Sequence, residues 1–143
     1  DRFVDLMEPS LADDDPADAA FIRSQIVEIR QRLRDLDPGE GGWGLIHGDV
    51  QELNFHFTAE NQITFFDFDL CGYGWRAYEI SYYYTRIREE LRAPVIAGYE
   101  SVRPLSVSER EMLPTFGKLA WIREGLMSRD LIEKLHDPYM KFD

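Results

Sequence analysis

Residues 45–74 read LIHGDVQELNFHFTAENQITFFDFDLCGYG, and the rest of the chain is best understood from this stretch. Three polar side chains in it have a definite spacing: Asp49 and Asn54 are five positions apart, and Asn54 and Asp67 are thirteen apart. Carboxylate and amide oxygens bind hard cations, and a carboxylate can also accept a proton from a hydroxyl. The stretch therefore gathers candidate chemical groups within one short segment.

A β-hairpin is predicted between Asn54 and Asp67. Residues 54–57 alternate in the manner of a strand with Phe55 and Phe57 on one face, residues 58–62 have the composition of a turn, and residues 63–66 form the return strand. Such a hairpin places Asn54 at its entry and Asp67 at its exit, side by side, so that the two side chains could share one ion.

The order of these groups is the one that phosphoryl transfer uses in kinases, namely a catalytic-loop Asp, an Asn five residues later and a second Asp. We assign Asp49 to positioning the acceptor hydroxyl and taking its proton, and Asn54 and Asp67 to a metal ion. Asp69, the second carboxylate of the DFD sequence, has two open roles: it binds a second Mg²⁺ or it caps the loop.

The paired motifs HGDxxxxN and FFDFDxxGYGxRxYE resemble the aminoglycoside phosphotransferase and choline kinase-like family, which is related to the protein kinases. The resemblance implies the C-lobe of a kinase-like fold, an α+β arrangement dominated by helices, with a small hairpin carrying the active-site loop. It implies Asp49 as catalytic base, His47 as the residue that orients it, Asn54 and Asp67 on Mg²⁺, and ATP or GTP as phosphate donor. The sequence departs from the family pattern at Gln51, Glu52 and Glu79.

An N-terminal nucleotide lobe is not recognisable in the sequence. Forty-six residues precede His47, and they contain no glycine-rich strand–loop–strand. We therefore expect residues 1–143 to form a single domain, the C-terminal catalytic-loop and substrate lobe of a longer kinase-like protein. Because half of the nucleotide cleft would then be missing, we expect the fragment alone to be inactive.

The composition limits the classes of partner. The chain has 16 Lys and Arg against 27 Asp and Glu, a formal net charge of −11, which argues against nucleic acid as a partner and is compatible with a cationic substrate. No apolar run approaches the length of a membrane-spanning helix, and Cys71 is the only cysteine, so neither an internal disulfide nor a thiolate metal site can form. A cytoplasmic location, without membrane contact, is the resulting expectation.

The segments around the central stretch are predicted to be mostly helical. Asp15 is expected to cap a helix whose apolar stripe contains Ile22, Ile26, Ile29, Leu33 and Leu36. A short buried strand is expected at residues 43–46, and a sharp turn around Tyr73 between its two glycines. Further helices are expected at residues 77–91 and 93–99, and another follows a capping box of Ser106 and Glu109 and runs to Leu131.

The function predicted from these patterns is transfer of the γ-phosphate of ATP or GTP to a hydroxyl of a small molecule, possibly a cationic one such as an aminoglycoside. The alternative is a kinase-like module that binds ligands without catalysis. A third hypothesis, in which DFD is the metal motif of a sugar-nucleotide transferase, leaves His47, Asp49 and Asn54 without a role.

Overall fold

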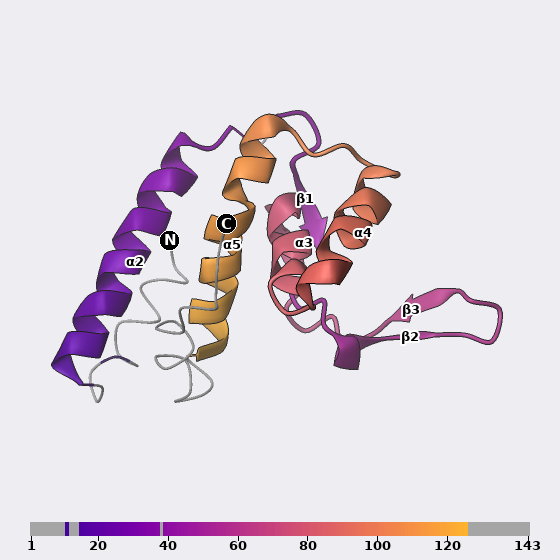
Figure 1. Ribbon diagram of the computed structural model, residues 1–143, viewed down its shortest axis with the longest axis horizontal. Coiled ribbons are helices and arrows are strands. Elements are labelled where there is room, and N and C mark those ends of the chain that lie inside the picture. The colour runs from indigo at the N-terminus through magenta and orange to yellow at the C-terminus, as the bar shows by residue number, and fades with distance from the viewer. Residues whose placement is uncertain (1–10, 12–14, 38, 126–143) are drawn as a thin grey trace. The chain divides into compact units, whose positions relative to one another are not determined.

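The computed structural model describes Leu11, residues 15–37 and residues 39–125 (Figure 1). The chain divides into two compact units, one drawn from residues 1–36 and 118–143 and the other made of residues 37–117.

The first unit is built on helix α2, Pro16–Asp35. The Asp15 side chain accepts a hydrogen bond from the Ala17 backbone N–H at 2.8 Å, and Pro16 occupies the first turn, so the predicted start of this helix is confirmed. Ile22, Ile26 and Ile29 are buried as the apolar stripe predicted. The same core includes Leu11, Ala19 and Ile122, with Leu33 partly buried against it.

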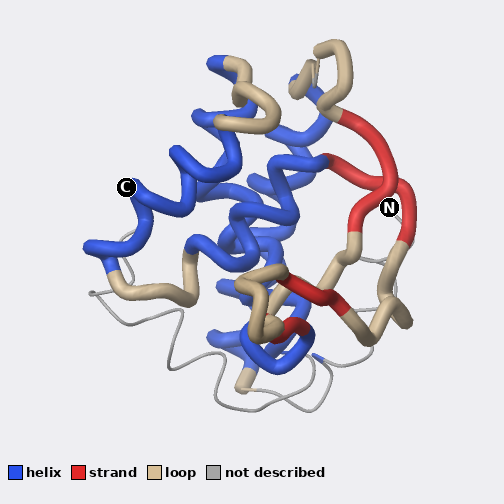
Figure 2. Tube along the Cα trace, turned by 90° about the vertical axis from the view of Figure 1, so that its right-hand side faces the viewer, coloured by secondary structure: helices blue, strands red, loops and turns tan. Residues whose placement is uncertain are grey.

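The second unit holds two separate two-stranded antiparallel sheets (Figure 2). Strand β2, Phe55–Phe57, pairs with β3, Ile63–Phe65, and Phe55 lies opposite Phe65. The connecting turn is closed by hydrogen bonds between Thr58 and Gln62, so the predicted hairpin is confirmed.

The other sheet pairs β1, Trp43–Ile46, with β4, Gly72–Trp75. Two expectations were wrong here. Strand β1 is not buried, since Trp43 is 47% and Leu45 63% exposed, and the Gly72–Gly74 segment is a strand rather than a sharp turn. Gly74 leaves room for a side chain of the opposite strand, because a Cβ added there would lie 2.7 Å from the Ile46 side chain.

Helices α3, Arg76–Tyr84, and α4, Glu89–Glu100, complete most of the unit. The single helix expected at residues 77–91 is wrong: the chain leaves the helical conformation after Tyr84, and α4 absorbs the segment expected to form a separate helix at 93–99. The Tyr78 ring packs against Phe116 at 6.1 Å between centroids, and Phe116 is fully buried.

Helix α5, Val107–Gly125, begins at the predicted capping box. The Glu109 N–H donates to Ser106 Oγ at 3.1 Å, and the Ser106 N–H donates to Glu109 Oε2 at 2.9 Å. Pro114 lies within the helix, and the expected continuation to Leu131 falls outside the described residues. None of the described helices combines the length and the apolar character that crossing a bilayer requires.

Candidate active site

The candidate site lies on the loop between β1 and β2, which contains His47, Gly48 and Asp49 and ends in a short 3₁₀ helix, Glu52–Asn54. Gly48 has a φ of +81°, in the left-handed region that glycine adopts without strain. A Cβ added at Gly48 would lie 2.4 Å from the Leu70 carbonyl oxygen. Glycine is therefore required here both by the backbone conformation and by the close approach of the segment that follows β3.

Two amide side chains hold the carboxylate of Asp49. Asn54 Nδ2 donates to Asp49 Oδ2 at 2.8 Å and to the Asp49 carbonyl oxygen at 2.9 Å, and Gln51 Nε2 donates to the same Oδ2 at 3.0 Å. Asn54 is 5% exposed, so its position is set by burial as well as by these bonds. Because both of these hydrogen bonds use Nδ2, the Oδ1 atom is not committed to Asp49 and is the atom of this side chain that could bind a metal ion.

His47 connects the loop to the far end of the hairpin. Its Nε2 lies 2.9 Å from the Phe66 carbonyl oxygen, and its Nδ1 accepts a 3.3 Å hydrogen bond from the Asp49 backbone N–H. A carbonyl oxygen can only accept, so Nε2 carries the proton and the ring is the neutral Nε2–H tautomer. The ring is 8% exposed and packs on Phe68 at 4.5 Å between centroids.

Glu79 of α3 anchors the loop from behind. Its Oε1 accepts a hydrogen bond from the Gly48 N–H at 3.0 Å, and its Oε2 accepts one from the His47 N–H. Sequence reasoning recorded Glu79 only as a departure from the family pattern and gave it no role. The sequence feature that could have indicated a role for Glu79 is its position as an acidic residue in the first turn of a helix that directly follows the motif.

The base of the hairpin brings Phe66, the residue before Asp67, against Asn54. The Phe66 N–H donates to the Asn54 carbonyl oxygen at 3.0 Å, which continues the strand pairing to the residue before Asp67. Asp67 has a φ of +62°, an uncommon conformation for a residue with a side chain and one that clusters at functional sites. Asp69 follows in the turn closed by the Cys71 N–H on the Phe68 carbonyl oxygen, and both Asp67 and Asp69 are exposed.

The donor set of this site is compatible with Mg²⁺. Within the described residues, no group of three or more His, Cys, Asp or Glu side chains could hold a metal ion by itself. Mg²⁺ does not need such a cage, because it is commonly bound by one or two carboxylates together with substrate phosphates and water. One amide oxygen from Asn54 and the exposed carboxylate of Asp67 therefore fit the ion when phosphate supplies further ligands.

Comparison with known proteins decides the family. Residues 3–109 match the phosphotransferase enzyme family, APH. The chain belongs to this family. This phosphotransferase-family chain is 31% identical to an uncharacterised protein of Synechocystis over 125 residues, which cover 80% of the chain and 35% of that protein. It is 29% identical to homoserine kinase of Brucella anthropi over 132 residues, which cover 84% of the chain and 36% of the kinase.

A solved structure supports the fold of this phosphotransferase-family chain. The microcompartment-associated aminopropanol kinase matches it with a TM-score of 0.63 and 27% identity, over 84% of the chain and 41% of that kinase. The mostly helical α+β architecture with small antiparallel sheets is thus a kinase-like fold. The chain spans about a third of the length of the two relatives described above.

Proposed function

We propose that the chain is the C-terminal, catalytic-loop lobe of a Mg²⁺-dependent phosphotransferase that moves the γ-phosphate of ATP, or of GTP, to a hydroxyl of a small molecule. The observation that carries the proposal is the fixed carboxylate of Asp49, held through one oxygen by Asn54 and Gln51. A module that only binds ligands does not require this arrangement next to two further oxygen ligands. Family membership and the fold support the same reaction class.

Each residue of the site takes a part in this reaction. Asp49 orients the acceptor hydroxyl and takes its proton as the oxygen attacks the γ-phosphorus, while the bond from that phosphorus to the β,γ-bridging oxygen breaks and the nucleoside diphosphate leaves. His47 holds the loop against Phe66 and so fixes the backbone of Asp49. Asn54 Oδ1 and the Asp67 carboxylate would hold a Mg²⁺ ion, which would supply positive charge beside the transferring phosphate. Asp69 would bind a second ion or cap the loop.

The acceptor that fits best is a small amino alcohol. Two of the relatives with a named substrate are a homoserine kinase and an aminopropanol kinase, and both names denote molecules that carry a hydroxyl and an amine. The formal net charge of −11 favours approach of a cationic acceptor. An aminoglycoside, which also combines amines with hydroxyls, belongs to the same chemical class.

The matched residues cover only 35% and 36% of the two relatives, so a nucleotide lobe outside residues 1–143 belongs to the proposal. The 143-residue chain by itself is then expected to show no nucleotide turnover. Measurable ATP hydrolysis or phosphoryl transfer by the isolated chain would contradict the proposal that nucleotide binding requires a second lobe.

The experiment compares full-length wild type with Asp49→Asn and Asp67→Ala. Binding of ATP and GTP with Mg²⁺ is measured by calorimetry, and ADP or GDP release is followed with homoserine or 1-amino-2-propanol as acceptor. Asp49→Asn should keep nucleotide binding and lose roughly 10²–10⁴ in turnover, the usual contribution of a general base. Asp67→Ala should weaken Mg²⁺-dependent nucleotide binding.

Glu60→Gln is the matched control, because Glu60 lies exposed in the hairpin turn and its removal leaves the loop contacts intact. Normal turnover by Asp49→Asn would exclude its role as base. Absence of Mg²⁺-dependent binding of either nucleotide by the wild-type protein would favour the binding module that does no catalysis.

A further inference from the structure

The side chain of Gln51 contacts the proposed base. Gln51 stands two residues after Asp49, at the position that directly precedes the 3₁₀ helix Glu52–Asn54. Polar side chains at such positions commonly cap the helix, yet within the described residues that of Gln51 makes no cap hydrogen bond. Its Nε2 instead donates back to Asp49 Oδ2 at 3.0 Å. The side chain is therefore directed to the base rather than to the helix that it precedes.

The chemistry of this contact fixes which end of the Gln51 amide faces Asp49. An ionised carboxylate can only accept hydrogen bonds, so the amide nitrogen and not the amide oxygen lies against Oδ2. The bond is partly buried, and its length is that of an ordinary hydrogen bond. Gln51 thus holds the carboxylate through a neutral donor, which adds no charge to the site.

The carboxylate of an aspartate needs such bonds, because its own covalent geometry does not hold it. The torsion about the Cβ–Cγ bond of Asp is broad, so neighbouring donors set the plane of the carboxylate. In this site Asn54 and Gln51 both donate to Asp49 Oδ2, at 2.8 and 3.0 Å. A general base is effective when it is oriented on the proton that it takes, so these two bonds bear on the rate of transfer.

The two donors to Asp49 differ in what else they do. In the proposed function Asn54 also binds Mg²⁺ through Oδ1, so the orientation of its amide depends on the ion as well as on Asp49. Gln51 has no part in that metal site, and its carbonyl oxygen accepts a hydrogen bond from the Asn54 N–H at 2.9 Å. Of the two donors, Gln51 is therefore the one whose amide is not shared with the ion.

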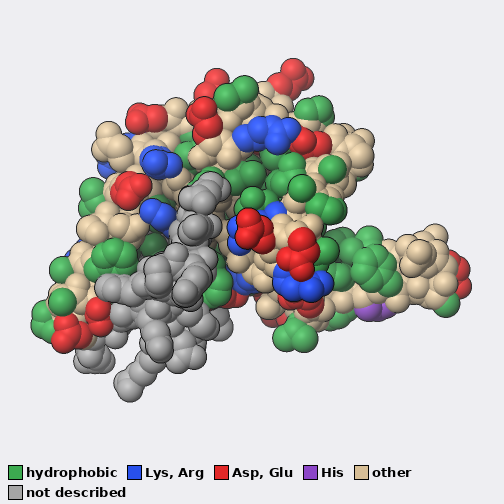
Figure 3. All heavy atoms as spheres, in the orientation of Figure 1, with side chains coloured by type: hydrophobic (Ala, Val, Ile, Leu, Met, Phe, Trp, Pro, Cys, Tyr) green, Lys and Arg blue, Asp and Glu red, His purple; other side chains and the backbone are tan. Residues whose placement is uncertain are grey.

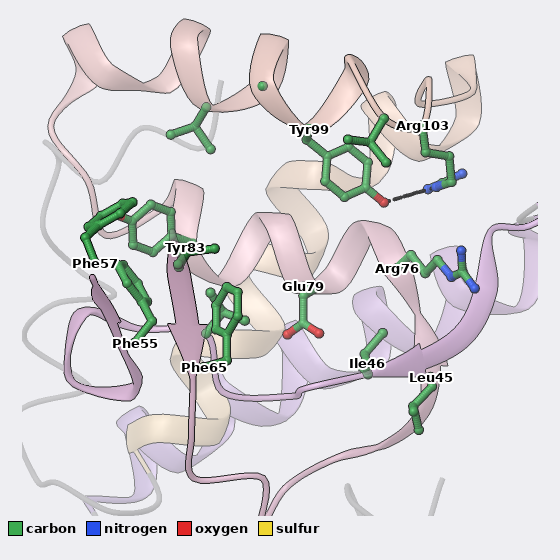
Figure 4. Close-up of a pocket in the computed structure, with 15 residues that line it drawn as sticks. Leu45, Ile46, Phe55, Phe57, Phe65, Arg76, Glu79, Tyr83, Tyr99 and Arg103 are labelled. Atoms are coloured by element: carbon green, nitrogen blue, oxygen red, sulfur yellow. Dashed lines mark hydrogen bonds between the residues drawn. The ribbon is translucent and has the colours of Figure 1, made fainter. Parts of the chain in front are cut away.

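The backbone of the loop is held separately from this carboxylate. Glu79 projects from α3 with its carboxylate toward the chain that follows β1 (Figure 4), where it accepts hydrogen bonds from the N–H groups of His47 and Gly48. These bonds fix the peptides that precede Asp49, not its side chain. Loss of the Gln51 bond should therefore release the Asp49 carboxylate while the loop stays in place.

We propose that Gln51 is a positioning residue for phosphoryl transfer and acts through Asp49. This inference rests on the proposed function and adds to it the group that directs the base. The Gln51 amide keeps both of its protons during the reaction. It holds the carboxylate in one orientation while Asp49 takes the proton of the acceptor hydroxyl.

The test compares full-length wild type with Gln51→Met, which keeps the length of the side chain but lacks the donor. Release of the nucleoside diphosphate is followed with homoserine or 1-amino-2-propanol as acceptor. Gln51→Met should lower kcat about 10- to 100-fold, the range that a hydrogen bond to a charged group contributes. The KM of the acceptor and the Mg²⁺-dependent affinity for the nucleotide should not change. Gln51→Glu has the shape of Gln, lacks the donor and adds a like charge beside Asp49, so its kcat should fall at least as far.

A double-mutant cycle separates this role from a purely structural one. In an Asp49→Asn background the base is already lost, so adding Gln51→Met should leave kcat nearly unchanged, because residues that act as a unit are not additive. If Gln51→Met lowered kcat as strongly in that background as in wild type, Gln51 would act on the substrate or the fold, and the proposal would be overturned. A wild-type kcat in a folded Gln51→Met or Gln51→Glu variant would overturn it as well.

Gln62→Met is the matched control, because it makes the same chemical change in the hairpin turn. Gln62 is exposed and takes part in the turn through its backbone N–H and carbonyl groups. The turn lies at the far end of the hairpin, which projects from the rest of the unit (Figure 3). Gln62→Met should keep the wild-type kcat, with circular dichroism confirming that all variants are folded. A wild-type protein without turnover would refute the proposed function itself, whereas normal wild-type turnover with an unaffected Gln51→Met would refute this inference alone.

Discussion

Replacing Gly48 by alanine should destabilise the residue 37–117 unit by about 2–5 kcal/mol. The backbone contribution comes from φ of +81°, where a non-glycine residue costs roughly 1–2 kcal/mol. The steric contribution comes from the new Cβ, 2.4 Å from the Leu70 carbonyl oxygen, since forcing atoms into packed space typically costs about 1–3 kcal/mol. The clashing atom is backbone, so relief requires movement of the chain that carries Asp67 and Asp69.

Urea unfolding followed by near-ultraviolet circular dichroism measures this cost. Trp43 and Trp75 lie on paired strands of the same unit with perpendicular rings 4.8 Å apart, so their signal reports on this unit. Gly98→Ala is the matched control: it lies inside α4 with space for a Cβ, and should stabilise by about 0.5–1 kcal/mol. A Gly48→Ala unfolding midpoint equal to that of wild type would refute the argument from conformation and clash.

Two further predictions concern the start of α5. Burial by itself would raise the pKa of Glu109, but the hydrogen bonds and charge of Arg103 and the Ser106 N–H outweigh it and hold the pKa below its usual range. A carboxyl group whose pKa is lowered by folding stabilises the fold at pH values above its unfolded pKa of about 4.3, and this stabilisation is lost as the pH falls through the folded pKa. In Glu109→Gln, the free energy of unfolding should therefore fall less steeply below about pH 4.5 than in wild type, as measured by urea titration at a series of pH values. A variant whose free energy of unfolding falls with acid as steeply as that of wild type would contradict this. Ser106→Ala should cost about 1 kcal/mol through loss of the cap, measured by the same titration at neutral pH, and no loss would mean that the hydrogen bond to Glu109 adds nothing.

The parts of the fold that sequence reasoning predicted correctly are those in which neighbouring residues determine the structure. The cap at Asp15, the capping box at Ser106 and the hairpin of residues 54–66 each depend on contacts within a few positions along the chain. The position of Asn54 against Phe66, the residue before Asp67, follows from the hairpin alone, because strand pairing fixes which residues meet at its base. Placing two of the proposed metal ligands therefore needed no knowledge of the tertiary structure.

The two errors about strands arose where distant segments pair. Strands β1 and β4 are separated by the whole hairpin, and their pairing appears in no local pattern of either segment. The glycines of β4 were interpreted as a turn because glycine usually marks one, but Gly74 instead makes room for the Ile46 side chain of the opposite strand. The same limit explains why β1 was expected to be buried: a four-residue apolar run does not reveal whether another layer covers it.

Glu79 is a residue of the candidate site whose role could not be predicted from local sequence patterns. The residue lies thirty-two positions after His47, and its bonds are to backbone N–H groups, which carry no side-chain pattern in the sequence. Its carboxylate nevertheless fixes the loop on which Asp49 stands, since it bonds the two amides that precede Asp49. The side chains proposed to take part in the chemistry could thus be predicted from their types and spacing. The group that holds them in place became visible only once α3 was positioned behind the loop.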